Sequence, residues 1–322
     1  MKIIGGDASL KDDSIYTYIT DSGRSSLRLI LTSRLKGKKF LIPDYLCRSV
    51  LDVFNENGVS YDFYRVRSDL TINKQEIKNK KYDVLYLINY FGNKRNIAAM
   101  TLRKGIIILE DNVFLPIFNK PAQVTNWIGF NSFRKISSVP EGSVVKSTIK
   151  LNERLISKEE SLFARLKYDG MHTKYAYMQH KKYSENKYLR LFARAEKLID
   201  RQRSIYSISS RGCVHLFEFN RTLETEYLIR QKNYETLDRY LKRYSIPIRS
   251  VYYSFYVFCC DRRDALREYL KSKKIYLPLH WPNPGDINNS LYQKVMSIPV
   301  DSRYDNKDMR AVAGLIKQFL RA

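Results

Sequence analysis

Short apolar runs alternate with helical patterns along the first 145 residues of the chain. Runs of strand length, rich in β-branched and aromatic residues, lie at 39–43, 61–66, 84–88, 106–109 and 127–133. Between them, apolar residues recur at helical spacing over 24–35, 49–57 and about 93–102. This alternation predicts an α/β fold with a mainly parallel sheet flanked by helices, and ligands at the carboxyl ends of its strands.

Beyond residue 150 the pattern changes to longer helices. Ser157 and Glu160 form a capping-box pattern before a helix that we expect to end near residue 168. The later pattern predicts helices at 185–203, 225–243 and 264–271, strands at 251–260 and 274–279, and a last helix that Asp305 caps and whose apolar face is Met309, Val312, Ile316 and Phe319. The C-terminal part is therefore expected to be a second, smaller α/β unit.

Composition narrows the class of protein. The 322 residues are 44% hydrophobic, which is enough for a sizeable core in one large domain plus a smaller one. The first residues lack the apolar segment of a signal peptide, and no run approaches the ~20 apolar residues of a membrane span, so we expect a cytoplasmic protein with no membrane contact. Four cysteines without a C-x-x-C pair and four scattered histidines predict free thiols and no metal site.

The formal charge of +24 leaves three interpretations open. Basic residues and tyrosines are interleaved between residues 146 and 211, a pattern that could follow a nucleic-acid backbone with stacked bases. The same residues could form a solvated helical surface, which we favour, so a nucleic-acid partner is not expected. A positive field would also concentrate a substrate that carries a diphosphate.

Lys135 is the candidate centre of the chemistry. It follows the apolar run that ends at Phe133, where a strand gives way to a turn. A lysine in this place can form a Schiff base with pyridoxal phosphate, provided that a carboxylate serves the ring nitrogen and a helix start serves the phosphate. Asp111 at the end of a buried strand and Ser22–Ser26 at the start of a helix supply both. The conjunction carries the hypothesis, since each signal alone is common.

Several short stretches carry a resemblance to a known family. In chain order they are Ser22–Leu27, Leu41–Tyr45, Asn89–Gly92, Leu109–Asp111, Ser132–Lys135 with Pro140–Gly142, Ile275–Pro282 and Ser297–Tyr304. Together they resemble the DegT/DnrJ/StrS sugar aminotransferases, which are pyridoxal-phosphate enzymes of fold type I. The likeness runs from about residue 20 to the end and is thinnest between residues 146 and 220.

Four departures make the chain similar to a divergent branch of that family. Only Arg134 separates Ser-Phe from the lysine, where the family usually has three residues. Ser143 and Pro140 replace two glycines, and Phe114 stands where the family usually has His or Gln near the cofactor hydroxyl. A degenerate member of the fold without transaminase activity therefore stays open as an alternative.

The resemblance implies a role for each matched residue. Lys135 would hold the cofactor and shuttle a proton, Asp111 would face the ring nitrogen, and the phosphate would lie against Arg24, Ser25 and Ser132. Cys47 would lie over the ring. Two further residues would face the substrate, His280 and Tyr45.

The resemblance also implies the wider organisation. It suggests a large cofactor-binding domain over residues 1–222, a small domain over 223–322 and a homodimer. The expected reaction transfers an amino group, with glutamate as the expected donor, to a nucleotide-linked keto sugar in polysaccharide, lipopolysaccharide or related sugar biosynthesis. The sugar, the aminated carbon and the pathway product stay open.

Overall fold

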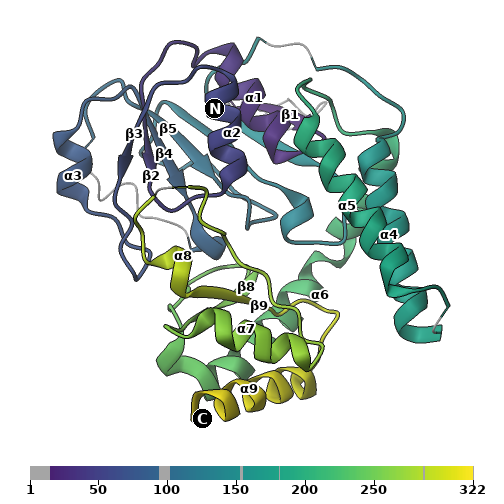
Figure 1. The fold of residues 1–322 in the computed structure, drawn as a ribbon. Coiled ribbons are helices and arrows are strands. Elements are labelled where there is room, and N and C mark those ends of the chain that lie inside the picture. Colours follow the sequence, from purple (N-terminus) through teal and green to yellow (C-terminus); the bar gives the residue numbers. More distant parts are fainter. Residues whose placement is uncertain (1–14, 94–101, 153–154, 181, 286, 322) are drawn as a thin grey trace, which may run out of the picture.

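A seven-stranded sheet forms the centre of the computed structural model, which describes residues 15–93, 102–152, 155–180, 182–285 and 287–321 (Figure 1). The strand order is β1-β7-β6-β5-β4-β2-β3, and β7 runs antiparallel to both of its neighbours while the pairs from β6 to β3 are parallel. The strands are β1 (Tyr16–Thr20), β2 (Phe40–Pro43), β3 (Tyr61–Tyr64), β4 (Val84–Ile88), β5 (Ile107–Asp111), β6 (Trp127–Phe130) and β7 (Ser143–Ser147). The predicted mainly parallel α/β sheet is confirmed.

Two amphipathic helices cover one face of this sheet. They are α1 (Gly23–Ser33) and α2 (Arg48–Glu56), which pack against each other as Figure 1 shows. Ser22 directly precedes α1 and caps it, since its hydroxyl accepts a hydrogen bond from the Ser25 amide at 3.2 Å. The helix buries Leu27, Ile30 and Leu31. Both helices were predicted to within two residues. The short α3 (Lys74–Asn79) was not predicted, and the helix expected at 93–102 lies almost wholly outside the described residues.

A helical hairpin stands beside the sheet and is formed by α4 (Leu162–His180) and α5 (Glu185–Arg201) (Figure 1). The two helices approach closely at Gly170, where an added Cβ would lie 2.6 Å from the Phe192 ring. The capping box predicted at residues 157–160 is wrong. Ile156 pairs with the chain at residues 205–207, and the helix begins only at Leu162, so Ser161 precedes it.

The long helix α6 (Ser210–Leu241) leads into the C-terminal part (Figure 1). There, β8 (Phe255–Cys259) pairs antiparallel with β9 (Val295–Pro299). Helices α7 (Arg263–Ser272), α8 (Leu291–Lys294) and α9 (Asn306–Arg321) complete this unit. α6 starts 15 residues before the predicted 225, since Ser209 caps it, and it runs across the proposed domain boundary at 222–223.

The C-terminal strand prediction was half right. The strand expected at 251–260 is β8, but residues 274–279 form no strand. Pro278 cannot donate a ladder hydrogen bond, and the partner of β8 is the later segment β9. The predicted cap of the last helix is confirmed, because the Asp305 carboxylate accepts hydrogen bonds from the amides of Lys307 and Asp308 at 2.7 and 3.0 Å. Within the described residues, no helix is long and apolar enough to cross a bilayer.

Candidate active site

The carboxyl ends of β5 and β6 and the start of α1 meet at one edge of the sheet. Asp111 ends β5 and pairs in register with Phe130 of β6. Two backbone hydrogen bonds connect the segments that meet here. The Gly142 amide donates to the Asp21 carbonyl at 2.7 Å, and the Phe133 amide donates to the Gly142 carbonyl at 3.1 Å. The predicted lysine, carboxylate and helix start are therefore brought to the same region, as the strand order requires.

Lys135 ends a 3₁₀ turn, Phe133–Lys135, which we call the lysine turn. Ser132 precedes it, and the amides of Lys135 and Ile136 donate to the carbonyls of Ser132 and Phe133, both at 3.1 Å. Phe133 is buried and anchors the turn, whereas Lys135 is exposed. Among the described residues, no carboxylate lies within ion-pair distance of the Lys135 ammonium group, so this amine is accessible to a ligand.

Asp111 is a buried carboxylate whose pKa is raised by burial and lowered by its neighbours. Only 3% of the residue is exposed, and burial raises its pKa to about 6. The Tyr86 hydroxyl at 2.6 Å and the Val113 amide at 3.0 Å donate to it, and these bonds, with the charge of Lys135, act to lower the pKa. Near neutral pH the ionised form prevails by about ten to one. A cationic group of a ligand would stabilise this carboxylate further.

The start of α1 is arranged for an anion, because the first amides of a helix lack partners within the helix. A Cβ on Gly23 would lie 3.3 Å from Cβ of Ser132, so the glycine lets the helix start approach the lysine turn closely. The Ser25 hydroxyl, however, donates to the buried Asp21 at 2.6 Å. The Lys158 ammonium group lies 2.6 Å from the same carboxylate and balances its charge.

The other predicted cofactor contacts have partners of their own. Arg24 forms an ion pair with Asp200 of α5 at 2.5 Å. Cys47 is the residue before α2, and its thiol lies 3.1 Å from the Ser49 hydroxyl. Of the predicted phosphate contacts, Ser132 has the geometry that best fits an added ligand, since it lies against the start of α1.

His280 and Tyr45, the predicted substrate contacts, lie together. His280 is 7% exposed, its Nδ1 lies 2.9 Å from the Ser297 hydroxyl, and its ring lies 4.6 Å from the Phe255 ring. Burial, together with the charge of Lys135, lowers the pKa of His280 to about 3, so the ring is neutral. Tyr45 is fully buried and donates its hydroxyl to the His280 carbonyl, which makes it a support for the histidine segment.

Phe114 belongs to the aromatic core beside this histidine. Its ring stacks on Phe91 at 4.9 Å and meets His280 edge to face at 5.4 Å. It is fully buried, so the position where the family usually has a polar residue is filled by packing. An interaction with a cofactor hydroxyl at this place would have to come from another side chain.

Sequence reasoning missed Tyr86 and Lys158, which support the two carboxylates of the site. Tyr86 lies 25 residues from Asp111 and Lys158 lies 137 residues from Asp21. Both partners are fixed by the tertiary fold. For Tyr86, the available signal was its position in a buried strand that neighbours β5. A tyrosine in such a strand places a hydroxyl in the core, where it needs a hydrogen-bond partner.

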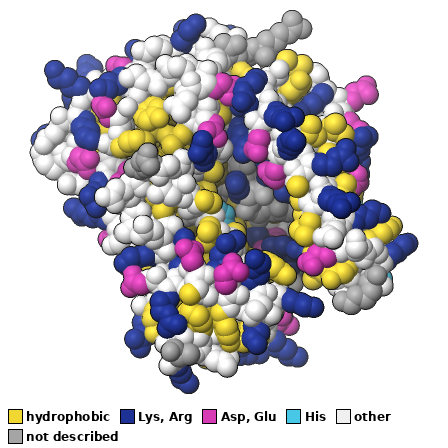
Figure 2. All heavy atoms as spheres, viewed as in Figure 1, with side chains coloured by type: hydrophobic (Ala, Val, Ile, Leu, Met, Phe, Trp, Pro, Cys, Tyr) yellow, Lys and Arg dark blue, Asp and Glu magenta, His cyan; other side chains and the backbone are white. Residues whose placement is uncertain are grey.

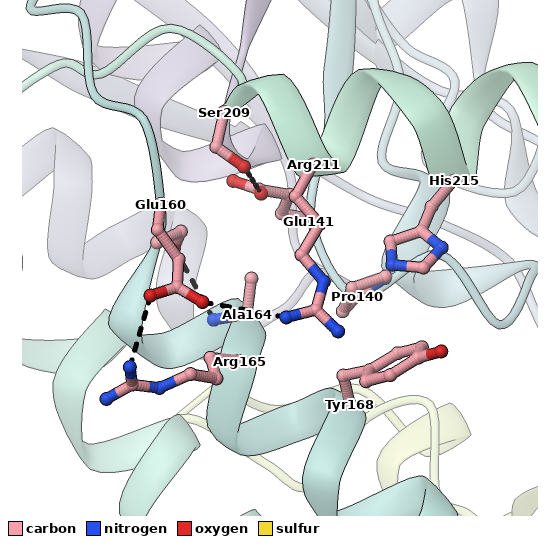
Figure 3. A pocket seen from close by; sticks show the side chains of 10 residues that line it. Pro140, Glu141, Glu160, Ala164, Arg165, Tyr168, Ser209, Arg211 and His215 are labelled. Atoms are coloured by element: carbon pink, nitrogen blue, oxygen red, sulfur yellow. Dashed lines mark hydrogen bonds and ion pairs between the residues drawn. The ribbon is translucent and has the colours of Figure 1, made fainter.

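A small cavity lies between α4 and the start of α6 (Figure 3). Its volume of about 10 Å³ suits roughly one water molecule. Glu141 lines it, is 1% exposed and receives a hydrogen bond from the Ser209 hydroxyl. Its second oxygen has no hydrogen-bond partner among the described residues, and burial raises its pKa. The cavity is too small for an organic cofactor. Because Glu141 binds Ser209, the residue that caps α6, it supports the start of that helix.

Comparisons with known proteins identify the fold. The architecture is that of the pyridoxal-phosphate-dependent transferases of fold type I. More narrowly, the chain is similar to a DegT/DnrJ/EryC1/StrS aminotransferase from Brucella abortus (17% identity, TM-score 0.64, 94% of this chain and 86% of that one). No protein-family model matches the sequence, and no curated protein matches it.

Two further solved structures show the same likeness. PseC from Helicobacter pylori, an aminotransferase in pseudoaminic acid biosynthesis, has 12% identity and a TM-score of 0.64 over 94% of this chain and 86% of that one. A mutant of GDP-4-keto-6-deoxymannose-3-dehydratase with bound GDP-perosamine has 16% identity and a TM-score of 0.63 over 94% and 88%. At these identities the likeness establishes the fold.

Proposed function

We propose that this protein is a pyridoxal-phosphate-dependent aminotransferase acting on a nucleotide-linked keto sugar. The observation that carries the proposal is the convergence of Lys135, the buried Asp111 and the Ser132–Gly23 contact at one edge of a fold type I sheet. The residues present fit the cofactor, because one end of the site favours a cation and the other favours an anion. Among the described residues, no cluster of side chains suited to a metal ion competes with this assignment.

Each residue has a distinct task in this proposal. Asp111 would hold a proton on the ring nitrogen of the cofactor, and Tyr86 and Val113 keep the Asp111 carboxylate in place. The Gly23 and Arg24 amides at the start of α1 and the Ser132 hydroxyl would bind the phosphate, since the next two amides already donate to Ser22. The amine of Lys135 would bind the cofactor and would move a proton at the reacting carbon. When bound, pyridoxal phosphate supplies the electron sink that stabilises the carbanion.

Positive charge beside the lysine turn supports an anionic substrate. Arg134 of the lysine turn and Lys167 of α4 both contact one oxygen of Glu196, at 2.6 and 2.7 Å. One carboxylate therefore pairs with two cations, which leaves a net positive charge. Lys and Arg side chains also gather over α4 and α5 beside a hollow in the surface (Figure 2). This surplus favours a substrate with a diphosphate. It agrees with solved relatives of the fold that are described with a TDP-sugar product or with GDP-perosamine.

The finer assignments rest on the resemblance. We propose glutamate as the amino donor, a homodimer as the working unit, and surface polysaccharide or related sugar biosynthesis as the setting. His280 is the proposed substrate contact.

The test is to add pyridoxal phosphate to the purified protein, reduce it with borohydride and map the labelled peptide. We expect a visible absorption band of lysine-bound cofactor and a label on Lys135. Lys135→Ala should abolish both, and Lys187→Ala, an exposed lysine on α5, is the matched control that should retain them.

Two outcomes would separate the alternatives. A wild-type protein that acquires neither colour nor label would refute the aminotransferase and favour a degenerate member of the fold. A labelled Lys135 without release of 2-oxoglutarate from glutamate, in the presence of a set of nucleotide-linked keto sugars, would retain the cofactor and refute the reaction.

A further inference from the structure

A buried arginine joins the residue that follows the lysine turn to the C-terminal part of the molecule. Arg230 of α6 is 3% exposed, and its Nη2 donates to the Ile136 carbonyl at 2.7 Å. Its Nη1 donates to the Ser254 carbonyl at 3.1 Å, directly before β8. Its Nε donates to Glu226 at 2.9 Å, which balances the charge. One guanidinium group therefore connects three segments that are distant in sequence.

The acceptor next to Lys135 is doubly held. Tyr252 also donates its hydroxyl to the Ile136 carbonyl, at 3.1 Å, and the Arg230 guanidinium lies 4.7 Å from the centre of the Tyr252 ring. A carbonyl oxygen has two lone pairs, so this acceptor is fully used. The peptide between Ile136 and Ser137, one residue beyond Lys135, thus has a fixed place relative to α6.

The second attachment of Arg230 leads to His280. The Ser254 carbonyl that it binds immediately precedes Phe255, whose ring packs 4.6 Å from the His280 ring. The charge of Lys135 is among the influences on the pKa values of both His280 and Asp111. The side chains proposed for catalysis and substrate contact therefore take their relative position in part from Arg230.

We propose that Arg230, with Tyr252, is a positioning residue that holds Lys135 in register with Asp111 and His280. This inference rests on the proposed role of Lys135. A displacement of about 1 Å at a reacting group can cost about a hundredfold in rate, whereas binding of the cofactor through its phosphate and ring nitrogen does not depend on the lysine.

The experiment compares attachment with binding. In Arg230→Met we expect the rate at which pyridoxal phosphate becomes fixed to Lys135, measured by borohydride quenching, to fall about 10- to 100-fold. The affinity for pyridoxamine phosphate, which lacks the aldehyde, should change by less than about twofold, because Asp111 and Ser132 are untouched. Tyr252→Phe removes one hydrogen bond at nearly constant volume and should slow attachment a few-fold.

A matched control separates positioning from stability. Arg263 is also a buried arginine with one carboxylate partner, Asp264, and a carbonyl acceptor, Tyr292, but it lies away from the lysine turn. Arg263→Met should destabilise the fold without slowing attachment. Equal slowing in both arginine variants, or equal loss of attachment and of pyridoxamine phosphate affinity in Arg230→Met, would overturn the proposal.

A cofactor-free measurement keeps this inference distinct from the proposed function. If the wild-type protein never attaches pyridoxal phosphate, the proposed function fails, and amide hydrogen exchange over residues 133–137 decides the role of Arg230. Exchange that is about tenfold faster in Arg230→Met, but unchanged in Arg263→Met, supports the positioning role. Unchanged exchange in both variants overturns it.

Discussion

Replacing Asp111 by asparagine should stabilise the cofactor-free protein while it destroys cofactor binding. Asparagine has nearly the same shape and can still accept hydrogen bonds from Tyr86 or Val113. Burial raises the pKa of Asp111 from 3.8 to about 6, so ionisation of this group opposes folding. In the unfolded chain the carboxyl ionises near its ordinary value.

The sign and size of the effect follow from this pKa difference. A raised folded-state pKa favours the folded state below the unfolded pKa, and the advantage is lost as the pH rises through about 6. A difference of about two pKa units corresponds to about 3 kcal/mol. Relative to the wild type, Asp111→Asn should therefore gain about 2.5 kcal/mol in free energy of unfolding between pH 4 and pH 7.5, nearly all of it below pH 7.

Urea unfolding of both proteins without cofactor, at half-unit steps of pH, measures this difference. Asp52→Asn on the exposed side of α2 controls for loss of a carboxyl group in general. A stability difference that stays constant with pH, or one that favours the wild type more strongly at pH 7.5 than at pH 4, would refute the charge argument. Pyridoxal phosphate should reverse the order, stabilising the wild type and leaving the variant almost unaffected.

Three further predictions test other parts of the site. Gly23→Ala places a Cβ 3.3 Å from Ser132, so we expect about tenfold weaker pyridoxal phosphate binding in a fluorescence titration, with less than about 1 kcal/mol change in stability. Because the pKa of His280 is about 3, wild type should lose about 2 kcal/mol of stability, relative to His280→Gln, as the pH falls from 7 to 5. Binding to duplex DNA, measured by anisotropy, should be no tighter than about 1 μM at 150 mM salt, and nanomolar binding would revive the nucleic-acid alternative.

The parts of the fold that sequence reasoning predicted are those with strong local signals. Buried parallel strands such as β4 and β5 read as continuous apolar runs, and helix starts carry capping residues such as Ser22 and Asp305. The strand expected at 274–279 failed because partner choice depends on distant chain, and β9 pairs with β8 instead. The start of α6 failed because its first half lacks a regular apolar face.

The site divides in the same way. Asp111, Ser132 and Lys135 stand at strand ends, so chain order alone predicts that they meet at one edge of the sheet. Arg230 acts across 94 residues on the Ile136 carbonyl, and no local pattern announces such a contact. Supports of this kind come from tertiary packing, which explains why the candidate catalytic groups were predictable and their supports were not.

The charge arrangement argues for a ligand with two unlike ends. At one end, Asp111 is a buried carboxylate whose pKa lies about two units above its usual value, so a cation beside it would be stabilising. At the other end, the first-turn amides of α1 and Ser132 favour an anion, while Asp21 and Lys158 already neutralise each other nearby. A pyridinium ring that carries a phosphate complements both ends at once. An anion alone would satisfy only the helix start and leave the cost at Asp111 unchanged. Protection against urea by pyridoxamine phosphate should therefore exceed protection by inorganic phosphate, and only the former should depend on Asp111.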